Sequence, residues 1–245
     1  MTSTLAIFIG IDPLYFLMLA PAMLLAMWAQ WRVHSAFANA ARVPVASGIS
    51  GAETAHMIMQ AHGVRDVRIE LGQGTLSDHY DPRHKVVRLS PDVYQGRSAA
   101  ALGIAAHEIG HVMQEKAGYA PLAIRNGIVP LASVGGQLGG LVFMIGFMLS
   151  MMTRGGSPVG SWLMIGAIGL FSLFVMFQLI NLPVEFDASR RAKQWLSSSG
   201  LVSEAEAPHV HRVLNAAAWT YVAATLMAIL TLAYYVLRAV GSRRE

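Results

Sequence analysis

Long apolar stretches alternate with polar stretches along this chain, and that alternation predicts its fold class. Four stretches are apolar over a length that suits a helix crossing a bilayer. They cover residues 13–31, 128–152, 161–182 and 217–237. The pattern therefore predicts a mostly α, polytopic membrane protein with about four transmembrane helices. The polar stretches between the spans predict a small α+β domain that folds in water.

The same pattern divides the chain into five segments. We expect the first transmembrane span in 1–31, a soluble domain in 32–125, two spans with a short loop in 126–182, a polar helix in 183–216, and the fourth span with a basic tail in 217–245. In the second span, Ala132, Gly136 and Gly140 form a small-x-x-x-small face. Such a face predicts close packing against a neighbouring helix.

Within 32–125 the periodicity changes from helix to strand and back to helix. Residues 51–62 form an amphipathic pattern, whereas 67–71 and 85–89 read as strands separated by turn residues. Ser98 can cap a further helix, which is expected to end at Gly118. The predicted small sheet lies ahead of that helix, and its edge strand can bind an extended peptide through backbone hydrogen bonds.

The helix expected after Ser98 carries the sequence His107-Glu108-Ile109-Gly110-His111. On a helix, His107 and His111 are four residues apart and lie on one face, so both imidazoles can bind one metal ion. Glu108 lies beside that face, where a carboxylate can take a proton from a metal-bound water. With 9 histidines in the chain, chance produces this H-E-x-x-H pattern in roughly one per cent of such sequences. The pattern is typical of zinc hydrolases and predicts a zincin-like domain.

A third ligand is expected because a peptidase zinc site has three protein ligands and an open position for water. Glu185 directly follows the third apolar stretch, and on a helix it shares a face with Ala188 and Ala192. These small residues leave room for another helix to pack beside the carboxylate. A solvated carboxylate at the membrane exit is the alternative for Glu185. Asp187 is two residues further on and faces another direction, so at most one of the two acidic residues is expected to bind metal.

Composition supports a membrane protein and excludes several other classes. The chain is 54% hydrophobic and 13% charged, and its mean hydropathy is positive. Its net charge of +4 is spread along the chain, without the basic run or aromatic stripe that nucleic-acid binding would need, so no nucleic-acid partner is expected. The chain has no cysteine, which excludes disulfides and thiolate metal sites.

The distribution of lysine and arginine predicts the orientation in the membrane. Residues 32–125 hold ten of them and 183–216 hold four. Under the positive-inside rule, both polar segments, and with them the metal site, are expected on the cytoplasmic side. Three arginines of the tail, Arg238, Arg243 and Arg244, would then lie outside and disagree with the rule.

Several stretches resemble those of the YugP-type membrane zinc metallopeptidases. They are Gly51-Ala52-Glu53, Ser77-Asp78-His79-Tyr80-Asp81-Pro82, Leu89-Ser90, Ala105-Ala106-His107-Glu108-Ile109-Gly110-His111, Leu182-Pro183-Val184-Glu185-Phe186-Asp187-Ala188-Ser189 and Asn215-Ala216-Ala217-Ala218. More distantly, the chain is similar to the HtpX and CAAX-prenyl protease group, where the glutamate of a Glu-x-x-Ala-Asp stretch is the third zinc ligand. Glu185 and Ala188 match that stretch, whereas Ser189 stands in the place of the aspartate. The resemblance implies a membrane-embedded zinc endopeptidase of the bacterial cell (inner) membrane.

Motif and resemblance together predict a zinc metalloendopeptidase in which His107, His111 and Glu185 bind Zn²⁺ and Glu108 is the general base. Its substrates would be polypeptides, such as membrane or misfolded proteins, cut at the cytoplasmic surface of the lipid bilayer. One alternative is a non-catalytic zinc-binding membrane scaffold. Another is a site-2-type intramembrane protease, although charged residues flank the motif here. The oligomeric state is left open.

Two further polar groups have both a functional and a structural interpretation. His79 or Tyr80, in the run Asp78-His79-Tyr80-Asp81, can donate to the oxyanion of a scissile carbonyl. The same run is equally typical of a turn. His209 and His211 are two residues apart before the fourth span, and surface histidines are favoured there over a second metal site.

Overall fold

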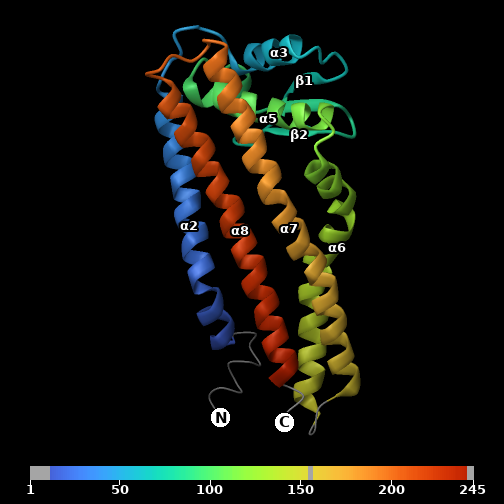
Figure 1. Ribbon diagram of the computed structural model, residues 1–245. Helices are drawn as coiled ribbons and strands as arrows, with labels where there is room; N and C mark the ends of the chain where they lie inside the picture. Colours follow the sequence, from blue (N-terminus) through green and yellow to red (C-terminus); the bar gives the residue numbers. More distant parts are fainter. Residues whose placement is uncertain (1–11, 154–156, 242–245) are drawn as a thin grey trace. The chain divides into compact units, whose positions relative to one another are not determined.

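The computed structural model describes residues 12–153 and 157–241. Helices dominate this part of the chain, and a single sheet of three strands accompanies them, which confirms the predicted fold class (Figure 1). In chain order the elements are α2 (Pro13–Ala41), α3 (Gly51–Ala61), β1 (Arg68–Leu71), β2 (His79–Asp81), β3 (Val86–Leu89), α4 (Pro91–Tyr94), α5 (Ala99–Lys116), α6 (Ala120–Met152), α7 (Pro158–Ser198) and α8 (Ala207–Gly241).

The chain forms two compact units, each made of segments that are far apart in the sequence. One, here called the membrane unit, consists of Met1–Trp28, Ile124–Asn181 and Tyr221–Glu245. The other, here called the site unit, consists of Ala29–Ala123 and Leu182–Thr220. The division into five segments remains a prediction, because compactness groups stretches by their contacts and not by their place relative to a bilayer.

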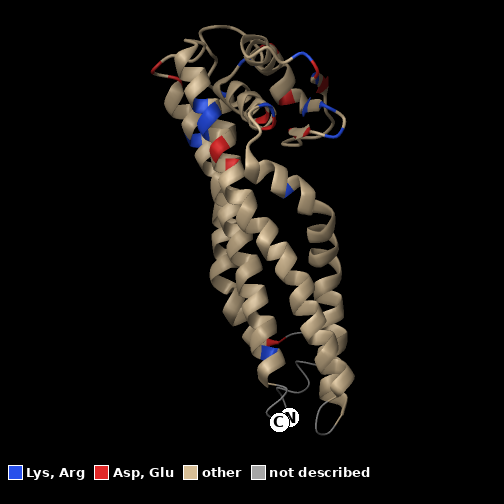
Figure 2. Cartoon of the chain, turned by 45° about the vertical axis from the view of Figure 1, so that its right-hand side comes forward, with Lys and Arg blue, Asp and Glu red and all other residues tan. Residues whose placement is uncertain are grey.

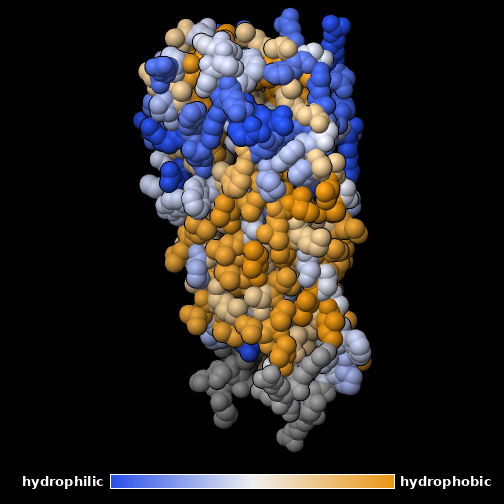
Figure 3. Space-filling view, viewed as in Figure 1, coloured by the Kyte–Doolittle hydropathy of each residue, from blue (hydrophilic) through white to orange (hydrophobic). Residues whose placement is uncertain are grey.

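Four helices of the described chain are long and apolar enough to cross a membrane, namely α2, α6, α7 and α8. Among the described residues of the membrane unit, only Asp12, Arg125 and Arg238 carry a charge, and in Figure 2 the parts of these helices that belong to the membrane unit are almost entirely tan. Large apolar side chains point outward, such as Leu17 and Trp162, which are more than 70% exposed. On the face seen in Figure 3, the surface of these helices is mostly apolar. Outward apolar surface of this kind is what a lipid environment requires.

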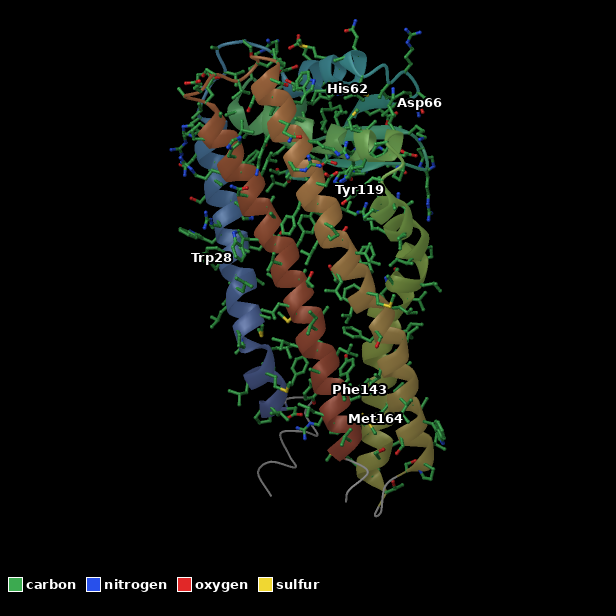
Figure 4. The ribbon with its side chains drawn as sticks, viewed as in Figure 1. Trp28, His62, Asp66, Tyr119, Phe143 and Met164 are labelled. Carbon is green, nitrogen blue, oxygen red and sulfur yellow. The ribbon has the colours of Figure 1, made fainter. Side chains whose placement is uncertain are left out.

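Small residues let α6 and α7 approach closely within the membrane unit. A Cβ on Gly135 would lie 2.4 Å from the Leu170 carbonyl oxygen, and one on Gly146 would lie 2.7 Å from that of Gly160. Close packing was predicted from Ala132, Gly136 and Gly140, but the narrowest backbone approaches lie at neighbouring positions. The interior also contains Phe143 and Met164, which are labelled in Figure 4.

An ion pair joins α2 to α8 in the membrane unit. Asp12 accepts hydrogen bonds from Arg238 Nε at 2.8 Å and from the Tyr234 hydroxyl at 2.5 Å. Its second oxygen accepts from the Leu14 amide at 3.0 Å, which satisfies a free donor in the first turn of α2. Arg238 is therefore part of helix α8 and is paired with a buried carboxylate. Arg243 and Arg244 lie outside the described residues.

The sheet of the site unit has the order β1-β3-β2, with β1 and β3 parallel and β2 antiparallel to β3. The predicted strands at 67–71 and 85–89 correspond to β1 and β3. Strand β2, which pairs Tyr80 with Val87, falls in the stretch that the sequence assigned to turns. Val86, Val87 and Leu89 of the central strand are fully buried, and Val87 and Leu89 join residues of α3 and α5 in one core.

Helix α7 includes residues of both units. The sequence divided this region between a span up to residue 182 and a polar helix from 183, and α7 contains the residues on both sides of that division. Pro183 lacks an amide hydrogen and leaves one carbonyl of the preceding turn without its helical partner. Helix α7 ends at Ser198, and Gly200 shortly after it has a φ of +69°, a conformation that glycine adopts without strain.

Candidate metal centre

Helix α5 places the two histidines of the motif on one face. Ser98 caps it by accepting a hydrogen bond from the Ala101 amide at 3.3 Å, as the sequence predicted. Lys116 at the other end donates to the carbonyl of His62, which is labelled in Figure 4. The ring centroids of His107 and His111 are 4.9 Å apart with the planes at 84°. The two rings are therefore adjacent but not stacked, so that each can turn its Nε2 toward a common point.

Helix α7 brings Glu185 to the same point by packing directly on α5. A Cβ on Gly110 would lie only 2.6 Å from the Ala188 carbonyl oxygen. Gly110 therefore costs α5 about 1 kcal/mol in helix propensity but permits a backbone approach that any side chain would block. Ala188 and Ala192, the small residues predicted to share a face with Glu185, are buried at this contact.

Three potential ligand atoms meet between the helices. Glu185 Oε2 lies 3.3 Å from His107 Nε2 and 3.6 Å from His111 Nε2, and all three atoms lie within 4.8 Å of one another. Ligand atoms about 2.1 Å from a tetrahedral zinc ion are about 3.4 Å apart, so the observed spacing fits that ion. Glu185 Oε2 is also buried without a hydrogen-bond partner, and a buried carboxylate oxygen needs a proton donor or a cation.

Glu108 lies next to this group but is not one of the three residues in it. Among the described residues, no lysine or arginine forms an ion pair with its side chain, and only 8% of the residue is exposed. Burial raises the pKa of Glu108 above its usual range, and the neighbouring His107 and His111 oppose that rise only in part. A carboxylate with a raised pKa binds a proton more readily than an ordinary surface glutamate.

The histidine nitrogens that face away from Glu185 also have partners. His107 Nδ1 lies 3.1 Å from Ser189 Oγ, and His111 Nδ1 lies 3.0 Å from Gln114 Oε1. Burial alone would lower the pKa of His111, but the carboxylates of Glu185 and Glu108 outweigh it and raise that pKa. Gln114 was not identified from the sequence, although its position three residues after His111 puts it on nearly the same face of the helix.

The second acidic residue after the third span does not point at the metal group. Asp187 accepts hydrogen bonds from Arg191 Nε at 2.6 Å, from Arg190 and from Gln114 Nε2 at 3.0 Å. Arg191 in turn lies over the ring of Tyr119, with 6.0 Å to the centroid (Figure 4). The different directions of Glu185 and Asp187 agree with their separation of two residues on one helix.

The polar run around β2 is occupied by contacts within the fold. Tyr80 donates its hydroxyl proton to Glu115 of α5, and burial together with that carboxylate raises the pKa of Tyr80. The His79 ring is exposed, with Nδ1 2.8 Å from the Ser77 carbonyl oxygen. Asp78 accepts from the Ser90 amide at 2.7 Å, and burial raises the pKa of this carboxyl group. These contacts favour the structural interpretation of the run.

Comparisons with known proteins found one family model and one relative. The model of the family described as "Putative neutral zinc metallopeptidase" matches residues 15–240. The chain is also 42% identical over 233 residues to the "Putative membrane protease YugP" of Bacillus subtilis (strain 168), an alignment that covers 95% of this chain and 99% of that protein. No solved structure shows a significant match. The resemblance drawn from the sequence motifs is confirmed.

Proposed function

Because this chain belongs to the family of neutral zinc metallopeptidases, we propose that it is a membrane-embedded zinc endopeptidase with His107, His111 and Glu185 as metal ligands. One observation carries the proposal. Three ligand atoms from two separate helices converge with the spacing of a zinc site, and a buried glutamate lies beside them. Three protein ligands leave one position open, which is the arrangement of catalytic rather than structural zinc.

The chain's own residues supply the proton transfers of peptide hydrolysis. A zinc ion held by the three ligands lowers the pKa of water and polarises a carbonyl group. Glu108 accepts the proton of the attacking water, because its raised pKa suits a base that works near neutral pH. Glu108 then passes this proton to the amine that leaves when the peptide bond breaks. The burial of Glu108 limits competing hydrogen bonds from solvent.

The substrate would bind in extended form along β2. This strand is an edge of the sheet and contacts α5. The Tyr80–Glu115 hydrogen bond fixes β2 to that helix, one turn beyond His111. The outer side of an edge strand presents free amide and carbonyl groups, so an unfolded polypeptide can add to it as a further strand.

The position of Glu185 on α7 supports a site at the membrane surface. Glu185 follows the apolar stretch 161–182 by three residues, which is about 5 Å along a helix axis. We infer that loops and unfolded segments of membrane proteins are the substrates. Cleavage confined to peptide bonds within transmembrane segments would contradict this inference.

Two other functions fit the geometry less well. In a site-2-type intramembrane protease the H-E-x-x-H helix would itself be apolar and cross the bilayer, but α5 is not among the four candidate spans of the described chain. A structural zinc scaffold would have four protein ligands. Among the residues that the structure describes, the metal group contains three.

Metal removal tests the proposed function directly. We expect the purified protein, in detergent micelles, to bind one zinc ion and to cleave an unfolded protein such as casein. Treatment with a zinc chelator should abolish cleavage, because the ligands alone have no means of activating water, and added zinc should restore it. The measurement is product formation by mass spectrometry together with the zinc content. Cleavage that persists after the zinc has been removed would contradict the proposal.

We also propose that the site unit faces the cytoplasm, on the basis of the fourteen lysine and arginine residues of segments 32–125 and 183–216. Since the chain has no cysteine, a single cysteine at the exposed Gln60 of α3 gives a clean test. A membrane-impermeant maleimide is expected to label Gln60→Cys only after the cells are opened. Labelling in intact cells would place the site unit outside.

A further inference from the structure

A buried glutamine connects the two helices that carry the metal ligands. Gln114 of α5 is completely buried. Its Oε1 lies 3.0 Å from His111 Nδ1, while its Nε2 donates to the Val184 carbonyl at 2.7 Å and to Asp187 Oδ2 at 3.0 Å. Val184 immediately precedes the third ligand, Glu185. One amide group therefore contacts a residue of each half of the candidate metal site.

The partners of Gln114 permit only one orientation of its amide. Both groups next to Nε2 are oxygen acceptors, and the amide nitrogen has two protons to give them. If the amide were turned over, its oxygen would face the Val184 carbonyl and the Asp187 carboxylate and would lose both hydrogen bonds. Asp187 is itself held by Arg190 and Arg191. The amide oxygen must therefore point at His111.

This orientation determines which nitrogen of His111 carries the proton. Oε1 is an acceptor only, so Nδ1 must be the protonated nitrogen of a neutral His111 ring. Nε2 then keeps its lone pair, and Nε2 is the atom that faces Glu185 at 3.6 Å. His107 differs, since its Nδ1 meets the hydroxyl of Ser189, which can donate or accept. Ser189 therefore holds the His107 ring without selecting a tautomer.

We propose that Gln114 is a positioning residue that fixes the metal-binding tautomer and direction of His111, and that Asp187 acts through it by fixing the amide. This inference rests on the zinc role proposed above. It gives Asp187, which does not contact the metal group itself, the role of orienting the Gln114 amide. It also predicts an asymmetry, with His111 depending on Gln114 more strongly than His107 depends on Ser189.

The test measures zinc affinity by competition with a chromophoric chelator, for wild type and four variants purified in detergent. Loss of a hydrogen-bond partner of a metal-ligating histidine typically lowers metal affinity by about 10–100-fold. We expect a loss in this range for Gln114→Leu and a smaller one for Ser189→Ala. Gln60→Leu, at an exposed position of α3, is the matched control and should bind zinc as wild type does. The fourth variant is the exchange Gln114→Glu with Asp187→Asn.

The exchange variant distinguishes a loss of His111 positioning from a general loss of packing around Gln114. It keeps an acceptor oxygen for His111 and a donor–acceptor pair between the two side chains, and it leaves their summed charge unchanged. It gives up the hydrogen bond to the Val184 carbonyl, so we expect it to recover part, but not all, of the affinity that Gln114→Leu loses. Thermal unfolding of the zinc-free proteins identifies any variant that is merely destabilised.

The possible outcomes distinguish the two proposals. If wild type binds no zinc, the proposed function fails. If wild type binds zinc and Gln114→Leu binds it equally well, the function stands and the inference about Gln114 is overturned. The inference is also overturned if the exchange variant unfolds like wild type when zinc-free but binds zinc no better than Gln114→Leu.

Discussion

The variant Glu108→Gln is expected to lose peptide-bond cleavage by about 10²–10⁴-fold, the usual contribution of a general base, while it still binds zinc. Glutamine has the size of glutamate but takes up no proton from water. Glu108 is not one of the three residues that form the metal group, so zinc content should match that of wild type. Replacing a desolvated carboxylate by a neutral amide should not destabilise the fold, because burial already disfavours the charged form.

The measurement is the initial rate of cleavage of an unfolded protein by equal amounts of zinc-loaded wild type and variant. Glu204→Gln, which makes the same change at an exposed position, is the control and should keep the wild-type rate. Equal residual cleavage in all preparations, including one treated with chelator, would reveal a contaminating protease. A Glu108→Gln variant with zinc bound and full activity would refute the general-base role.

Local sequence pattern was sufficient for the helix that carries the two histidines. The limits of α5 can be read from the sequence. Ser98 caps its first turn, alanine-rich turns follow, and Gly118 comes just after its end. The spacing of His107 and His111 then determines that they share a face. The four candidate spans could also be predicted from the sequence, because a helix that crosses a bilayer needs an unbroken apolar run of nearly fixed length.

Features that depend on distant partners were missed. The strand β2 is short and polar, and its local pattern is that of a turn, so only its pairing with β3 makes it a strand. The role of Gln114 depends on Val184 and Asp187, which are about seventy residues away. A glutamine one turn after a metal-binding histidine is a usable signal, but its partner on α7 could not be read from the sequence.

The packing of the spans shows the same limit. The sequence shows a small-residue face on the second span. It does not show the register of the contact with α7, because that register depends on the positions of both helices along their axes. This is why Gly135 and Gly146, and not the predicted positions, make the closest backbone approaches. Asp12 lies just outside the first apolar stretch, and nothing in its neighbourhood reveals that its partner is Arg238.

The variant Glu185→Gln is expected to lose zinc, and with it all cleavage that depends on the metal. Glu185 Oε2 is the atom shared by both close contacts of the metal group, at 3.3 Å to His107 and 3.6 Å to His111. An amide removes the negative charge that pairs with the ion and leaves two strong protein ligands where catalytic zinc has three. The loss of affinity should therefore exceed the about 10–100-fold typical of a residue that only orients a ligand.

Asp187→Asn is the matched control, because it makes the same chemical change two residues away on α7. Asp187 contacts Gln114 and two arginines but not the metal group, so this variant should stay within the range of an orienting residue. The measurement is zinc retained after dialysis against a chelator of known affinity, with the helical content of each protein as a check on folding. Should Asp187→Asn lose zinc while Glu185→Gln keeps it, the third ligand would be Asp187, and α7 would have to turn by about 160° for that carboxylate to reach the two histidines.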